Sequence, residues 1–178
     1  ILLLTLICGS FSLSASHFAG AEIGYEYLST NPNGSHQYKL RLQIYRDVSG
    51  IQLNLIQNIC LNSSCYGQQI IPLTFLPVSP QNGGNGRQAL PVPDLASCVD
   101  PNDPNMVTIE IYFFEALVTL PGNCTDFKFS WHGNARNVNN IDNLVFGAQT
   151  DLYIETLLNN TLGQDTSPLF VNPAAKSF

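Results

Sequence analysis

Apolar and polar residues alternate along several segments of this chain, and this period-two pattern restricts the fold more than any other sequence feature. Segments 23–27, 38–44 and 127–131 place apolar side chains at every second position, with polar residues or glycine between them. That spacing predicts strands with one buried face, because neighbouring side chains of a strand point to opposite sides. The tetrapeptide at 31–34 (Asn-Pro-Asn-Gly) predicts the turn between the first two strands. Trp131 lies on the apolar side of its segment, so we expect it in the core.

The segment 107–120 also alternates, but its apolar residues change parity along the way. The first series occupies odd positions and the second occupies even positions: Val107, Ile109, Ile111 and Phe113, then Ala116, Val118 and Leu120. No turn residue separates the two series, so we predict a β-bulge near Phe114–Glu115 that keeps both on the buried side. Segment 150–158 is predicted as a strand, with a short helix as the alternative.

Irregular connectors rich in Pro, Asn and Gly separate these segments, chiefly at 77–93, 100–105 and 134–143. Only 11% of the 178 residues carry a charge, which argues against a helix bundle, and 44% are hydrophobic, which excludes a disordered chain. The length fits a single domain. Together these features predict an all-β fold, an antiparallel β-sandwich of the immunoglobulin-like type.

The start of the chain has the character of a secretory signal peptide. An apolar run too short to span a bilayer is followed by Ser14 and Ser16, which have the spacing of a cleavage site before His17. The protein is therefore expected outside the cell or on its surface, and not embedded in a membrane. We divide the chain into three parts: a signal-peptide remnant at 1–16, a β-sandwich domain at 17–165, and a linker or the first strand of a following domain at 166–178.

Cys8 lies in the signal-peptide remnant, and export places the other four cysteines in an oxidising compartment. An even number of cysteines there predicts two disulfides. The four are Cys60, Cys65, Cys98 and Cys124, and all three pairings are open. Being five positions apart, Cys60 and Cys65 would point to opposite faces of one strand. This favours either a local loop closed by a 60–65 bridge or two bridges to distant partners. The spacing lacks the paired Cys-x-x-Cys motif of structural zinc sites.

The charge pattern and the motifs exclude several classes of function. A net charge of −6 without a basic block argues against nucleic-acid binding. None of the common catalytic motifs occurs. Glu22 and Glu26 share a strand face, as a pair of acid/base carboxylates would, but we interpret them as solvated residues opposite an apolar face. We therefore predict a protein that is not an enzyme and needs no cofactor.

Two groups of loop residues are candidate sites. Oxygen ligands of the kind that calcium prefers occur at Asp100, Asn102 and Asp103, although the neighbouring prolines and the lack of an EF-hand pattern weaken this calcium hypothesis. Arg46 and Arg136 adjoin turn-forming residues, and each is expected to anchor a loop through backbone carbonyls or a carboxylate, because an isolated buried guanidinium is costly. The expected loop-anchoring set is Arg46, Asp47, Arg136, Asn137 and Asn140.

A set of short motifs also carries a family resemblance. In chain order they are His17–Ile23 (HFAGAEI), Tyr45–Asp47 with Ser49–Gly50, Val118–Pro121 with Cys124, Ala135–Asn137 with Asn140–Ile141, Leu157–Asn160, and Thr166–Phe170. In this order they resemble the N-terminal β-domain of large, exported Bacteroidota surface proteins. Such proteins often carry PKD or other immunoglobulin-like repeats, and they commonly end in a gliding-motility-associated sorting domain of type IX secretion.

The resemblance implies no catalytic residues, and this chain departs from the family pattern at two places. The family usually has cysteines where this chain has Val48 and Asn134–Ala135. If those cysteines normally form a bridge, this chain keeps the two loops adjacent without that bond.

From these features we expect a non-enzymatic extracellular β-sandwich module of a larger cell-surface or secreted protein, with an adhesive or structural role. Its expected partners are other domains of the same polypeptide and surface glycans or proteins. A carbohydrate-binding module of a secreted enzyme is the alternative, and its sign would be exposed Tyr or Trp rings in a row on one sheet face. A secreted hydrolase is the third hypothesis, and it would require a deep pocket with facing carboxylates.

Overall fold

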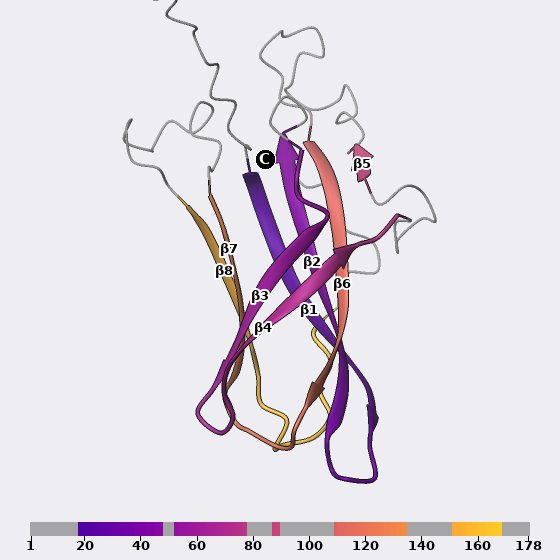
Figure 1. Cartoon of the computed structure of the whole chain (residues 1–178), viewed down its shortest axis with the longest axis vertical. Helices are drawn as coiled ribbons and strands as arrows, with labels where there is room; N and C mark the ends of the chain where they lie inside the picture. Colours follow the sequence, from indigo (N-terminus) through magenta and orange to yellow (C-terminus); the bar gives the residue numbers. More distant parts are fainter. Residues whose placement is uncertain (1–17, 48–51, 78–86, 90–108, 135–150, 169–178) are drawn as a thin grey trace, which may run out of the picture.

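The computed structural model describes residues 18–47, 52–77, 87–89, 109–134 and 151–168, and these contain strands and turns but no helix (Figure 1). The predicted strand at 150–158 is therefore a strand and not the alternative helix. The strands are β1 (Phe18–Thr30), β2 (His36–Asp47), β3 (Ile56–Ser63), β4 (Gly67–Phe75), β5 (Arg87–Ala89), β6 (Ile109–Leu120), β7 (Phe127–Gly133) and β8 (Leu152–Leu158).

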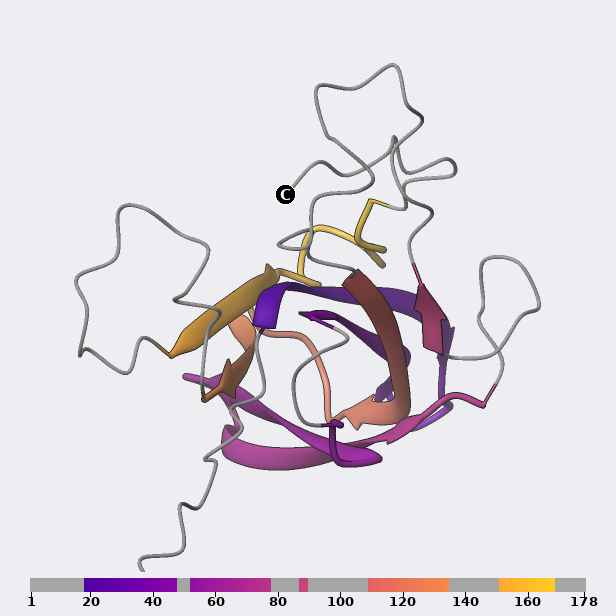
Figure 2. The same ribbon diagram turned by 90° about the horizontal axis from the view of Figure 1, so that it is seen from above.

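The strands form a single antiparallel sheet in the order β1-β2-β6-β4-β3-β7-β8, and β5 pairs with β6 off this path. The sheet curls round on itself, so that the view from above shows a nearly closed ring with β8 next to β1 and with β3 and β4 on the opposite wall (Figure 2). The prediction of an all-β antiparallel fold is confirmed. Two clearly separate layers are not seen, because all the described strands belong to one curled sheet.

The hydrophobic core fills the inside of this ring. Leu40 and Leu42 of β2 and Phe127 and Phe129 of β7 are fully buried, as their alternation predicts. Trp131 is also buried, and its ring meets that of Phe18 edge to face with centroids 5.4 Å apart, so its predicted place in the core is confirmed. Inward-facing residues of seven strands therefore hold the fold together through apolar burial.

The predicted β-bulge near Phe114–Glu115 is wrong. Strand β6 pairs with β2 in unbroken register from Ile109 to Leu120, and its even-numbered residues from Tyr112 to Leu120 face the core. The odd-numbered residues at its start point to the other side of the sheet, where they form a second buried cluster with Tyr45. Both faces of β6 are covered there, so the parity change reflects burial on two sides and not a shift in register.

The hairpin between β1 and β2 closes with the predicted turn. The Asn31 amide donates to the Ser35 carbonyl at 2.8 Å, and the Gly34 amide donates to the Asn31 carbonyl at 2.9 Å. Gly34 has a φ of 82°, a left-handed conformation that glycine adopts without steric cost. This turn, the β3–β4 turn and the β6–β7 connection lie at one end of the ring, which we call the hairpin end (Figure 1).

Several expectations fall on residues outside the described ranges. The signal-peptide remnant at 1–16 and His17 lie there, as does most of the expected linker at 166–178. Within the described residues, no helix has the length and hydrophobicity needed to span a bilayer.

Candidate functional site

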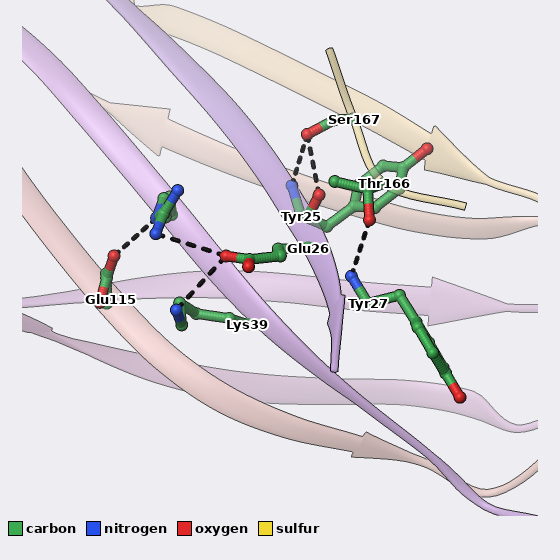
Figure 3. Close-up of polar contacts among 8 residues, drawn as sticks. Tyr25, Glu26, Tyr27, Lys39, Glu115, Thr166 and Ser167 are labelled. Carbon is green, nitrogen blue, oxygen red and sulfur yellow. Dashed lines mark hydrogen bonds and ion pairs between the residues drawn. The ribbon is translucent and has the colours of Figure 1, made fainter. Parts of the chain in front are cut away.

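A cluster of charged side chains crosses the outward face of β1, β2 and β6 (Figure 3). Glu26 Oε2 lies 3.3 Å from Lys39 Nζ and 3.3 Å from Arg41 Nη2, and Arg41 Nε lies 2.6 Å from Glu115 Oε1. Each of these side chains is about a quarter to a third exposed. We call these four residues the ion-pair cluster.

The ion-pair cluster fastens three strands to one another. Arg41 of β2 stands opposite Glu115 in the β2–β6 ladder. Its guanidinium contacts Glu115 on β6, on one side, and Glu26 on β1, on the other. Surface pairs of this kind contribute little individually, about 0–1 kcal/mol each, and gain from forming a network.

The two carboxylates that the sequence places on one strand face have separate partners. Glu26 belongs to the ion-pair cluster, whereas Glu22 accepts a hydrogen bond from the Tyr45 hydroxyl at 3.1 Å. Their interpretation as simply solvated residues therefore misses these contacts. An acid/base pair needs two carboxylates that face a shared space, whereas these two are engaged with different neighbours.

A short segment after β8 is bonded to the edge of β1 (Figure 3). The Tyr25 amide donates to Ser167 Oγ at 2.8 Å, and the Ser167 amide donates to the Tyr25 carbonyl at 2.8 Å. The Tyr27 amide donates to Thr166 Oγ1 at 3.0 Å. Gly24 leaves room for this approach, because a Cβ there would lie 3.0 Å from Ser167 Oγ. The segment thus satisfies edge groups of β1 that β8 does not reach.

A group of tyrosines lies behind this segment at the hairpin end. The Tyr25 hydroxyl donates to the Leu157 carbonyl at 3.2 Å and lies 3.5 Å from Asp165 Oδ2. Burial raises the pKa of Tyr25, and Asp165 raises it further. Burial, together with neighbouring Tyr27, Tyr25 and Asp165, raises the pKa of Tyr38 to about 12. These shifts keep both hydroxyls neutral, as befits a structural role.

The Tyr38 hydroxyl is fully buried and has no hydrogen-bond partner among the described residues. Asn160 lies close enough to oppose the rise in its pKa, but it makes no hydrogen bond to this hydroxyl. Asn160 Oδ1 accepts from the Cys124 amide at 2.8 Å, and Nδ2 donates to the Gly122 carbonyl at 3.2 Å. An unsatisfied buried hydroxyl costs stability at neutral pH.

Replacing this tyrosine by phenylalanine (Tyr38→Phe) is expected to leave the free energy of unfolding unchanged or to raise it by about 1 kcal/mol at pH 7. At alkaline pH the variant should also lose less stability. A tyrosine in the unfolded chain releases its proton near pH 10, whereas Tyr38 in the folded protein releases it only near pH 12. The free energy of unfolding of wild type therefore falls by about 2–3 kcal/mol between these two pH values through this group. Urea unfolding across that range measures the difference, and equal losses in both proteins would contradict the assignment.

A buried ion pair lies at the opposite end of the ring. Arg46 of β2 is almost fully buried and pairs with Glu110, which stands opposite it in the β2–β6 ladder. Its guanidinium carbon also lies 5.9 Å from the centroid of the Tyr112 ring. Asp47 ends β2 opposite Ile109. The other expected loop-anchoring residues, Arg136, Asn137 and Asn140, lie outside the described residues.

The described cysteines form one disulfide. Cys65 in the β3–β4 turn is bonded to Cys124 in the β6–β7 connection, 59 positions away, so the hypothesis of a local 60–65 bridge is wrong. Cys60 is unbonded, and Cys98 lies outside the described residues. Asp126 approaches the two bonded sulfurs, but sulfurs in a disulfide carry no thiolate to bind a metal. The calcium candidates Asp100, Asn102 and Asp103 also lie outside the described residues.

Two strands that the sequence patterns did not single out form the wall opposite β1. Strands β3 and β4 pair along their whole length, and neither contains a charged residue. The signal for this wall is present in the sequence, because positions 48–86 contain no Asp, Glu, Lys, Arg or His. Polar alternation is weak there, since Ile56 and Ile70 point outward and are exposed.

Comparison with known proteins identifies no relative. No family model matches this chain, and no curated protein or solved structure matches it either. The assignment of function therefore depends on the residues described above.

Proposed function

We propose that this chain is a non-enzymatic extracellular β-module of a larger cell-surface or secreted protein, with an adhesive or structural role. The observation that supports this proposal is the use of its charged side chains. Among the described residues, the charged side chains with known contacts all form an ion pair or a hydrogen bond with a neighbouring strand or turn. Charges used in this way fix the scaffold and leave recognition to the surface and loops.

The resemblance to the N-terminal β-domain of Bacteroidota surface proteins supports the same proposal. It covers nearly the whole mature chain and implies export, neighbouring domains on the same polypeptide and no catalytic residues. The described strands form a single curled sheet. The two-layer, immunoglobulin-like sandwich therefore stays a prediction and is part of this proposal.

The test is an in-frame deletion of the module from the parent protein in the organism that produces it. We expect cells to attach less well to surfaces or to one another, while the remainder of the protein is still exported. The purified chain should also show no turnover in a screen of glycoside, ester and peptide substrates. Turnover by the purified chain that an unrelated β-protein, prepared in the same way, does not show would overturn the proposal.

The carbohydrate-binding alternative has less support. The large exposed aromatic residues among those described are Tyr66 and Tyr153. Tyr66 lies in the β3–β4 turn, where its ring stacks on Phe127, whereas Tyr153 lies on β8 next to Glu155. The two rings do not form a row on one sheet face, and Trp131 is buried. Glycan-array binding by the purified chain would reverse this ranking.

A further inference from the structure

The disulfide at the hairpin end is accessible from one side only. Cys65 in the β3–β4 turn is exposed, whereas Cys124 in the β6–β7 connection is only 2% exposed. An external thiolate therefore reaches this disulfide at Cys65. Its attack forms a new bond to Cys65 Sγ and breaks the bond between the two cysteines. The electron pair of the broken bond leaves on Cys124 Sγ, which becomes a thiolate.

A carboxylate lies beside the sulfur that would leave. Asp126 Oδ1 is 2.9 Å from Cys124 Sγ, and this oxygen and both sulfurs lie within 4.8 Å of one another. Ser64 holds the carboxylate in place, because its amide donates to both Asp126 oxygens at 3.2 Å and its hydroxyl donates to Oδ1 at 3.0 Å. Among the described residues, no Lys, Arg or His side chain pairs with Asp126, so no described neighbour neutralises its charge.

We propose that Asp126 protects the exposed disulfide against exchange with external thiols. Negative charge in the transition state of exchange is shared by the attacking sulfur and the two protein sulfurs. A fixed carboxylate within 4.8 Å of both protein sulfurs repels this charge, most strongly the charge on Cys124 Sγ. The crosslink therefore persists in the presence of thiols although Cys65 is exposed. This inference does not depend on the proposed function.

The surroundings of the disulfide also favour its re-closure after an attack. The Cys124 amide donates to Asn160 Oδ1 at 2.8 Å, and the Tyr66 ring stacks on Phe127 with centroids 5.9 Å apart. These contacts join the same two segments as the disulfide and do not require it. A Cys124 thiolate released by an attack therefore stays close to Cys65. Because Asp126 repels this thiolate, its return to Cys65 Sγ, which expels the external thiol, is favoured.

The test is the rate at which excess dithiothreitol reduces the folded protein at mildly alkaline pH and low ionic strength. Samples are quenched with a maleimide, and mass spectrometry of the peptides that contain Cys65 and Cys124 measures the reduced fraction. Asp126→Asn keeps an oxygen that accepts from Ser64 but removes the charge, and it should be reduced at least about tenfold faster than wild type. Asp126→Ser is a second charge-free variant in case Asp126→Asn does not fold.

The matched control makes the same change far from the disulfide. Asp151 precedes β8 at the other end of the ring, where it pairs with His132, so Asp151→Asn should be reduced at the wild-type rate. Added salt should narrow the difference between wild type and Asp126→Asn, because it screens the carboxylate. With glutathione as the thiol, the mixed disulfide trapped by acid should carry glutathione on Cys65.

The dependence on thiol concentration separates attack on the folded protein from attack after unfolding. The rate should rise in proportion to thiol concentration, because the exposed residue reacts in the folded state. Equal rates for wild type and the charge-free variants, a rate that stops rising because unfolding limits it, or glutathione found on Cys124 would each overturn the proposal. These measurements do not bear on the deletion and substrate tests above, so the two proposals fail separately.

Discussion

Replacing Cys65 and Cys124 together by alanine is expected to lower the free energy of unfolding by about 4 kcal/mol. The disulfide joins residues 59 positions apart, and closing a loop of this length removes a large conformational entropy from the unfolded chain. It also ties the β3–β4 turn to the β6–β7 connection, between segments that meet only through tertiary structure. Chemical denaturation of the oxidised wild type and the double variant measures the loss.

Two controls separate the crosslink from side-chain packing at this position. Cys60 is unbonded, so Cys60→Ala should change stability by no more than about 1 kcal/mol. Reduction of wild type leaves both side chains in place and should reproduce most of the loss seen in the double variant. If the reduced protein is as stable as the oxidised one, the stabilising role of the crosslink is refuted.

Replacing Glu110 by alanine should lower the free energy of unfolding by about 3 kcal/mol. Arg46 is only 3% exposed, and it forms an ion pair with Glu110, which stands opposite it in the β2–β6 ladder. Removing one partner of a buried pair leaves the other charge in an environment that solvates it poorly. Thermal or urea unfolding of Glu110→Ala at neutral pH measures the cost.

The matched control changes the same residue type on the same strand. Glu115 pairs with Arg41 on the outward face, where both side chains are partly exposed. Glu115→Ala should therefore cost about 1 kcal/mol or less. The double substitution Arg46→Met/Glu110→Leu should recover part of the stability lost in Glu110→Ala, because no charge is left buried. Equal costs for the two single substitutions would show that burial does not set the strength of these pairs.

Strands with one apolar and one polar face could be predicted from the sequence. Strands β3 and β4 could not, because their exposed face also carries Ile56 and Ile70. Alternation correctly indicates the strands around Tyr25, Leu42 and Phe129. It misleads at the start of β6, where Ile111 is buried in a second cluster that includes Leu76, more than thirty positions earlier. Such long-range cover leaves no local periodicity to detect.

The order of the strands and most site contacts were also beyond local patterns. Arg46 was expected to need a carboxylate or carbonyl partner, but its pairing with Glu110 depends on the register between β2 and β6. The same register brings Arg41 to Glu115. The wall formed by β3 and β4 is different, because the charge-free stretch at 48–86 is visible in the sequence, and only the pairing of the two strands required the structure.

The junction between β1 and β8 has a consequence for how rigid the molecule is. Seven strands alternate in direction along the sheet path, so the first and the last run the same way and no backbone ladder joins them within the described residues. The hydroxyls of Thr166 and Ser167 bond to β1 there instead, together with one backbone bond from the Ser167 amide to the Tyr25 carbonyl. Side-chain hydroxyls rotate and tolerate small displacements that a ladder does not. The seam between β1 and β8 is therefore more compliant than the long β2–β6 and β7–β8 ladders, and the circumference of the ring can widen or narrow there.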